Sequence, residues 1–424
     1  MNQPPLHCPE AISVQRPERT VMANGVPLSV LNVGESEVTR IDLLFEAGRF
    51  RQAAPLQALF TNRMLREGTQ SLSGAELAER LDYYGAWLDL SVTAEHAHVT
   101  LYSLNRYLPE TLPLLESIVK EPTFPQEELQ TVVEANYRQF LINCSRVDFL
   151  ALRALREALF GPTHPCGKMA TGEDYQRLTA EGLRQFYTRY YHSRNLSVGL
   201  SGRITPACLD RVERTLGSAP FGEGFLAPER RTFWIHPDDL RRTYVRRDDA
   251  MQSAVRMGLL SIDRRHPDYL ALRVLVTLLG GYFGSRLMQN IREEKGFTYH
   301  IQADLTPYPG GSTIIIGSET TNEFVNPLIC EVYHEMRRLQ EEPVGEAELT
   351  MVKNYLIGDL CRNCESAFSL ADVWTYIQLS GLSETYFADY VRTIREMTPE
   401  RIRQLAQTYL RLNDIKEAVA GRDA

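Results

Sequence analysis

The spacing of apolar residues along the chain predicts strands and helices in alternation. Runs of aliphatic and β-branched residues at 38–46 and 253–261 are typical of strands. Each run is followed by a segment with apolar residues at helical spacing, 56–66 after the first and 266–279 after the second. The same order of elements therefore occurs twice, once in each half of the chain.

Two further segments have the pattern of β-hairpins. They span 87–101 and 298–317, and the second contains the turn sequence Pro-Tyr-Pro-Gly-Gly at 307–311. A hairpin pairs its strands antiparallel, and long helical segments follow each of these two. The pattern predicts an α+β fold in which antiparallel-rich sheets are each covered by long helices.

Sequence motifs recur with nearly constant spacing, which indicates two homologous halves. Thr179 lies at the start of the predicted helix LTAEGLRQFYTRYY, and Thr398 lies at the start of MTPERIRQLAQTYL, 219 residues further on. Three more pairs recur at offsets of 211 to 220 residues: 200–203 with 419–422, 127–129 with 347–349, and 84–92 with 295–303.

These repeats divide the chain into two domains of similar size. We predict a first domain at 1–217, a linker at 218–235 and a second domain at 236–424. The linker contains several Gly and Pro residues, which is the composition expected of a connecting segment.

Composition makes some partners and locations improbable. The formal net charge of −8 gives no electrostatic reason to expect a nucleic acid partner. The first ten residues lack the basic and apolar regions of a secretory signal, and the most apolar stretch, 269–284, is too short for a membrane span and contains Arg273. Seven irregularly spaced cysteines favour reduced thiols. We therefore expect a cytoplasmic protein without a membrane span.

Few residues in the chain have the spacing of a catalytic or metal site. The imidazoles of His96 and His98 could share one face of a strand, but the sequence indicates no third ligand, so a solvated or interface strand is favoured. Cys361 and Cys364 form a C-x-x-C pair without the second pair or the βαβ context that a zinc or redox site requires. We expect both to be ordinary cysteines of a helix.

The segment LLGGYFGSRLMQNIREEKGFTYHI at 278–301 has the most specific pattern in the chain. It resembles the C-terminal domain signature of the insulinase or pitrilysin-like peptidases, family M16. Further matches are HPCGKMATG at 164–172 and MLREGTQSLSG at 64–74, so that the resemblance extends over about residues 20–422. It implies two homologous domains with the LuxS/MPP-like fold of this family.

The resemblance also shows where the metal site of the family would lie. Active members hold zinc on an inverted His-x-x-Glu-His helix directly before the Met-Leu pair, with a distal glutamate further along. The corresponding positions here are 59–63, where Leu59, Asn62 and Arg63 replace both histidines and the general base. Glu134 lies near the expected distal carboxylate. We expect no metal on this chain, and core packing for Leu59.

A second part of the family's site is retained. Active members use an Arg and a Tyr seven residues apart, which correspond to Arg292 and Tyr299. By resemblance, Tyr299 would donate a hydrogen bond to the oxyanion of the tetrahedral intermediate, and Arg292 would hold substrate carbonyl groups. The structural alternatives are an ion pair of Arg292 with Glu293 or Glu294 and a half-buried strand position for Tyr299.

The resemblance therefore predicts a subunit without its own zinc site. It would pair with a zinc-bearing M16 homologue, or self-associate, and bind extended peptides by main-chain hydrogen bonds to a sheet edge. Zinc would be present only on the partner. One alternative is a structural, assembly or accessory protein-modification role with no proteolysis. Another is an unconventional hydrolase that acts alone.

Overall fold

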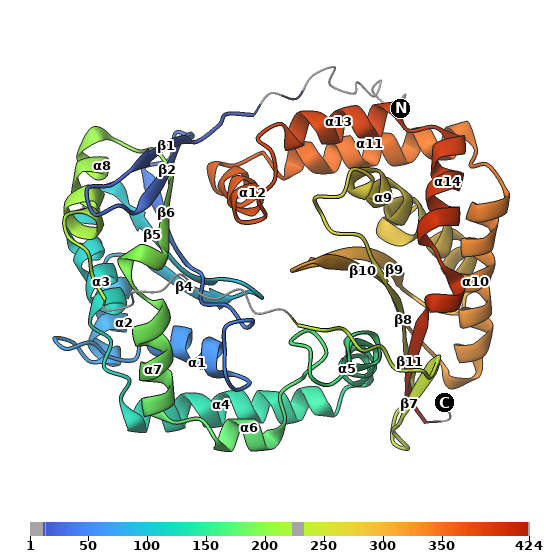
Figure 1. The fold of residues 1–424 in the computed structure, drawn as a ribbon, viewed down its shortest axis with the longest axis horizontal. Coiled ribbons are helices and arrows are strands. Elements are labelled where there is room, and N and C mark those ends of the chain that lie inside the picture. Colours follow the sequence, from blue (N-terminus) through green and yellow to red (C-terminus); the bar gives the residue numbers. More distant parts are fainter. Residues whose placement is uncertain (1–11, 13, 223–232, 423–424) are drawn as a thin grey trace.

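The chain forms two β-sheets that face each other, each with helices on its outer side (Figure 1). The computed structural model describes residues 12, 14–222 and 233–422. The first sheet has the strand order β1-β2-β6-β3-β5-β4. Its strands are β1 (Glu18–Val21), β2 (Pro27–Asn32), β3 (Val38–Phe45), β4 (Trp87–Val92), β5 (Ala97–Leu104) and β6 (Leu196–Gly202).

The second sheet has the order β7-β11-β8-β10-β9. Its strands are β7 (Arg242–Arg246), β8 (Ser253–Ser261), β9 (Ile301–Tyr308), β10 (Gly311–Thr320) and β11 (Lys416–Gly421). In each sheet only one pair is parallel, β2 with β6 and β7 with β11, and it occupies the same place in the order. Apart from β1, the two sheets therefore have one topology.

Both sheets pack their outer face against helices because their strands alternate between apolar and polar sides. In the first half, Ile41, Leu43 and Phe45 of β3 point into this core and are fully buried. The helices of this half are α1 (Gln57–Met64), α2 (Gly74–Tyr83), α3 (Leu108–Lys120), α4 (Gln126–Cys144), α6 (Gly172–Gln176), α7 (Ala180–Tyr190) and α8 (Pro206–Val212).

The second half repeats this arrangement with its own core. Val255, Met257 and Leu259 of β8 are buried against the helical layer. That layer consists of α9 (Tyr269–Val276), α10 (Val325–Glu341), α11 (Glu346–Arg362), α13 (Tyr386–Glu396) and α14 (Pro399–Tyr409). None of the helices in the described part of the chain is long and apolar enough to cross a membrane.

Two helices cross from one half to the other. Helix α5 (Val147–Phe160) belongs to the first half in sequence but packs on β7, β8 and β11 of the second sheet. Helix α12 (Ala367–Leu379), at the equivalent repeat position, packs on β2 and β6 of the first sheet. Both lie on the inner faces (Figure 1). The two halves therefore exchange equivalent helices.

A buried ion network accompanies α12. Arg40 of β3 pairs with Asp42 at 2.9 Å and with Asp372 of α12 at 2.6 Å, and it donates to the carbonyl of Phe368 at 3.1 Å. Thr100 donates a further hydrogen bond to Asp42 at 2.8 Å. Arg40 and Asp42 are buried, whereas the side chain of Asp372 is 63% exposed, so α12 is joined to β3 by one solvent-screened ion pair and one hydrogen bond to its backbone.

The α+β class, the order of elements and the predicted hairpins are confirmed. The two halves share one topology, as the repeats indicate. The helix predicted at 266–279 begins at Tyr269 and continues to Gly281, as an α-helix to Val276 and as a π-helix over Thr277–Gly281. The domain limits at 217 and 236 stay a prediction, and residues 223–232 of the predicted linker lie outside the described residues.

Shortening a buried side chain of the exchanged helix α5 should destabilise the protein strongly. Leu155 is fully buried against the second sheet, so Leu155→Ala should lower the free energy of unfolding by about 2–5 kcal/mol. Leu141→Ala, at a half-exposed position of α4, is the matched control and should change it by less than about 0.5 kcal/mol. Urea unfolding followed by circular dichroism measures both, and equal effects would contradict the packing described for α5.

Candidate functional site

The positions that correspond to the family's zinc ligands lie on α1, directly beneath the β4–β5 hairpin. Asn62 is fully buried there. Its amide donates to the carbonyl groups of Ser91 and His98, both at 3.0 Å, and its oxygen accepts from the hydroxyl of Tyr191 at 3.1 Å. The side chain of Asn62, predicted from the sequence to stand in place of the family's general base, therefore uses its polar atoms to hold α1 to the hairpin.

The neighbouring positions do not offer metal ligands either. Leu59 packs at the border of the first core, as expected. The guanidinium of Arg63 donates a hydrogen bond to the side-chain oxygen of Asn136 on α4. Glu134 points to solvent and pairs with Arg138 at 3.3 Å. Within the described residues no group of three or more His, Cys, Asp or Glu side chains could hold a metal ion.

A cavity of about 770 Å³ opens beside Arg63, and we call it the β4 cavity. It lies between α1, α2, α4 and strand β4, which is the edge strand of the first sheet. Its lining includes Arg66, Leu77, Trp87, Leu88, Leu90 and Asn136. Trp87 is 66% exposed. Burial lowers the pKa of Arg63, although the guanidinium remains charged at neutral pH.

The predicted Arg and Tyr pair lies in the second half. Arg292 lies in the last turn of a π-helical segment, Met288–Glu294, where it pairs with Glu293 at 3.5 Å and lies 4.7 Å from the ring centre of Phe283. Tyr299 precedes β9 and is 87% exposed, so a half-buried strand position is wrong for this residue. The reason is that the chain between Gly296 and Ile301 is a turn and not yet a strand.

Tyr299 lines a second cavity, of about 520 Å³, on the inner face of the second sheet. Arg156 of α5, Arg256 of β8 and Asp304 of β9 also line it. Burial lowers the pKa of both arginines and raises the pKa of Asp304. This cavity and the β4 cavity share no lining residue. In one copy of the chain, Tyr299 and Arg63 therefore belong to separate surfaces.

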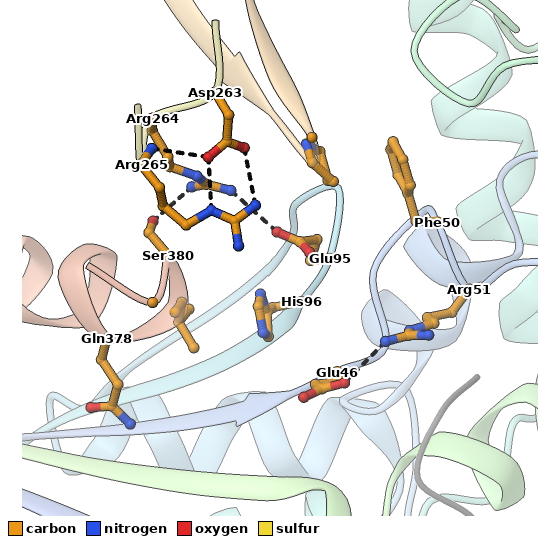
Figure 2. A pocket seen from close by; sticks show the side chains of 14 residues that line it. Glu46, Phe50, Arg51, Glu95, His96, Asp263, Arg264, Arg265, Gln378 and Ser380 are labelled. Atoms are coloured by element: carbon orange, nitrogen blue, oxygen red, sulfur yellow. Dashed lines mark hydrogen bonds and ion pairs between the residues drawn. The ribbon is translucent and has the colours of Figure 1, made fainter. Parts of the chain in front are cut away.

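A third cavity, of about 390 Å³, lies where the two halves meet (Figure 2). Equivalent loops of both halves line it, namely the segments after β3 and β8 and the tips of the two hairpins. Arg264 spans the junction, because it pairs with Glu95 at 3.3 Å and donates to the hydroxyl of Ser380 at 2.6 Å. Figure 2 also shows the pair of Glu46 with Arg51, at 3.0 Å.

His96 projects into this junction cavity (Figure 2). Burial, together with the charges of His98, Arg51 and Arg264, lowers its pKa from the ordinary 6.5 to about 4. Burial also lowers the pKa of His98. The two rings lie 6.4 Å apart, and no third potential ligand joins them among the residues that the structure describes.

The cysteines form no disulfide within the described residues. Cys361 lies in the last turn of α11, and Cys364 follows it in a turn. Burial raises the pKa of Cys364 to about 11, so this thiol is protonated and poorly reactive at neutral pH. Cys8 lies outside the described residues.

Two family models match the chain. The first, insulinase (peptidase family M16), matches residues 37–162, and the second, the peptidase M16 inactive domain, matches residues 177–356. The chain belongs to the M16 peptidase family.

Relatives of similar length carry names that differ in the activity they state. The chain is 25% identical over 364 residues to the non-peptidase homolog YmxG of Helicobacter pylori, covering 84% of this chain and 82% of the relative. It is 23% identical over 389 residues to the probable inactive metalloprotease YmfF of Bacillus subtilis, covering 83% and 88%. An uncharacterized zinc protease YmxG of Bacillus subtilis is 22% identical, with coverage of 83% and 85%.

Solved structures share the fold along nearly the whole chain. A peptidase M16 inactive domain from Pseudomonas fluorescens has a TM-score of 0.86 at 23% identity, covering 97% of this chain and 99% of that one. A protease from Helicobacter pylori has a TM-score of 0.87 at 15% identity, with coverage of 96% and 100%.

The sequence did not predict contacts between residues that are far apart along the chain. Asn136 is 73 positions from Arg63, and Arg264 is 169 positions from Glu95. Neither pair has a local spacing motif, so only the packing of helices on sheets reveals it. The assignment of Leu59, Asn62 and Arg63 to the family's zinc-motif positions stays a prediction, and the sequence did not indicate the hydrogen-bond partners of Asn62 and Arg63.

The purified chain should contain no stoichiometric zinc, because Leu59, Asn62 and Arg63 offer no metal-binding lone pairs in the required positions. Elemental analysis after dialysis measures the metal content. Peptidase assays with and without a chelator test the same point, and one tightly bound zinc per chain would contradict it.

Acid should destabilise the protein through His96. The pKa of His96 is about 4 in the folded protein and 6.5 in the unfolded chain. Between pH 4 and pH 6.5 the imidazole is therefore protonated in the unfolded chain but neutral in the folded protein. The contribution of neutral His96 to the free energy of unfolding is therefore complete above pH 6.5. It falls by about 2–3 kcal/mol as the pH decreases towards 4. Urea unfolding at several pH values measures this loss. His96→Gln should flatten the curve, and an unchanged slope would contradict the assignment.

Proposed function

We propose that this chain is an M16 subunit that binds peptides and supplies Arg292 and Tyr299 to a catalytic centre whose zinc is held by a partner subunit. The observation that carries this proposal is a contrast between the two halves. Asn62 is locked into hydrogen bonds, whereas the Tyr299 phenol is 87% exposed in a cavity on the inner face. In the described part of the first half, Leu59, Asn62 and Arg63 provide no zinc ligands, but the second half presents an exposed hydrogen-bond donor.

Peptide binding would use the sheet edges. Strand β4 ends the first sheet and β9 ends the second, so each pairs with one neighbour only. An extended peptide can add to such an edge through main-chain hydrogen bonds, while nearby pockets select side chains. Cavities lie beside both edges, since Trp87 and Leu88 of β4 line one, and Gln302 and Asp304 of β9 line the other.

The roles proposed for the two residues are those that the family resemblance implies. Tyr299 would donate its hydroxyl hydrogen to the oxygen that becomes negative when water adds to the peptide carbonyl. Arg292, held over Phe283 and near Glu293, would bind carbonyl groups of the substrate backbone. The partner would supply the zinc that activates the water. A zinc-bearing homologue is the preferred partner, and self-association is the alternative.

A second candidate is an assembly or accessory role without proteolysis. The names of two relatives, a non-peptidase homolog and a probable inactive metalloprotease, favour it. In that case the exposed Tyr299 would contact a partner surface and no bond would be broken. Isolation of the native complex, followed by zinc analysis and a peptidase assay, separates the two candidates.

Kinetics of the reconstituted pair should distinguish the two residues. Tyr299→Phe should leave KM nearly unchanged and lower kcat by about 10²–10³-fold, because the phenol acts on charge that develops in the transition state. Arg292→Ala should raise KM and lower kcat together, since carbonyl groups are held in both states. Steady-state assays with a fluorogenic peptide measure both constants.

Tyr83→Phe is the matched control, because Tyr83 is 79% exposed and lies on α2. It should leave both constants unchanged. If the Tyr299 and Arg292 variants also kept wild-type kcat and KM, their catalytic role would be refuted and the assembly role favoured.

A further inference from the structure

The β4 cavity contains a positive charge without a negative partner in the described structure. Arg63 lines this cavity, is partly buried, and makes its described hydrogen bond to the neutral amide oxygen of Asn136. Asn136 is itself held in place, since its amide nitrogen donates to the carbonyl of Val132 at 2.7 Å. Burial lowers the pKa of Arg63, with smaller effects from Tyr175 and Arg66, and no carboxylate contributes to this shift.

The other charges of the cavity do not neutralise Arg63. Arg66 and Glu67 pair with each other at 3.5 Å. Asp89 of β4 also lines the cavity, and its charge acts on the pKa values of His98 and Tyr102, but it forms no ion pair with Arg63 in the described structure. Asp82 also lines the cavity, from the last turn of α2, but forms no ion pair with Arg63 in the described structure.

We propose that the β4 cavity binds an extended peptide through a carboxylate that pairs with Arg63. This inference rests on the proposed peptide binding and adds the class of peptide. A guanidinium presents two parallel N–H donors that match the two oxygens of a carboxylate. In a partly buried site such a bond is stronger than in water, because fewer water molecules compete for the charge. The carboxylate is either the C-terminus of the peptide or an Asp or Glu side chain.

The peptide lies along the free edge of β4, and in this position it can reach the guanidinium of Arg63. Trp87 starts the edge strand and Leu88 follows it, and both line the same cavity as Arg63. A peptide that adds to β4 therefore places a neighbouring side chain or its terminus beside the guanidinium. Trp87 is 66% exposed, so its indole fluorescence reports occupation of the cavity.

Three synthetic peptides test the proposal on the full chain. All are acetylated nine-residue peptides of one Thr, Val and Ser sequence. The first ends in a free carboxylate, the second ends in a carboxamide, and the third ends in a carboxamide but has a central Glu. Binding is measured by Trp fluorescence and by calorimetry. Trp87→Phe should abolish the fluorescence change but not the heat, which assigns the signal to this cavity.

The wild-type chain should bind one or both of the carboxylate peptides about 10-fold to 100-fold more tightly than the uncharged peptide. The tighter of the two identifies the source of the carboxylate. Arg63→Gln should remove this preference and leave weak binding of all three peptides. Arg63→Lys should retain part of it, since a point charge remains. Arg138→Gln, a change outside the cavity, should keep the full preference.

The outcomes separate this inference from the proposed function. Equal binding of all three peptides by the wild type would support peptide binding and overturn the role of Arg63. A preference that survives in a folded Arg63→Gln variant, as judged by its circular dichroism and melting temperature, would also overturn it. Absence of binding for every peptide would overturn both this inference and the peptide-binding part of the proposed function.

Discussion

The structure depends on the exchange of two helices between its halves. Helix α5 leaves the first half and covers β7, β8 and β11, whereas α12 leaves the second half and covers β2 and β6. Leu155, Leu159 and Phe160 are buried by this crossing, and each contributes about 1.5–3 kcal/mol of apolar burial. The halves cannot separate without exposing these side chains. The crossing therefore keeps the two inner faces opposed and places two of the cavities, the one on the inner face of the second sheet and the one at the junction of the halves.

The two crossing helices differ in how much of the opposite sheet they cover. Contacts of α5 reach across three strands of the second sheet, whereas α12 packs mainly on β2 and β6 of the first sheet. Near its start α12 also touches β3, through the ion pair of Arg40 with Asp372, and β5, through the ring of Phe368 against Tyr102. The β4 edge lies beyond these described contacts, and polar side chains of β4 such as Asp89 and Ser91 are exposed. The edge that a peptide would use is accessible for this reason.

The replaced zinc positions form a chemically consistent set. Leu59 packs against apolar neighbours. Asn62 has a neutral amide in place of a carboxylate, and this amide donates to two strand carbonyl groups. Arg63 carries a positive charge itself. A buried carboxylate at 62 would face those carbonyl oxygens without the metal, which is unfavourable. In this chain the helix supports the β4–β5 hairpin through Asn62. Arg63 alone still presents its charge to a cavity.

The sequence alone determined the class of fold, the duplication and the absence of the zinc motif. Strands, helices and hairpins depend on local periodicity, and the repeat offsets of 211 to 220 residues made the second half a copy of the first. The family resemblance located Leu59, Asn62, Arg63, Arg292 and Tyr299, and it did so because motifs are local. The chemistry of Leu59, Asn62 and Arg63 is the reason that the sequence predicts no metal at these three positions.

Only the tertiary structure decided what surrounds these residues. The exchange of α5 and α12, the partners of Asn62 on β4 and β5, and the exposure of Tyr299 all arise from contacts between segments far apart in sequence. The same is true of the neutral partner of Arg63, which lies on another helix. A side chain's burial and charge balance depend on what the whole fold places beside it, and local periodicity contains no record of those neighbours.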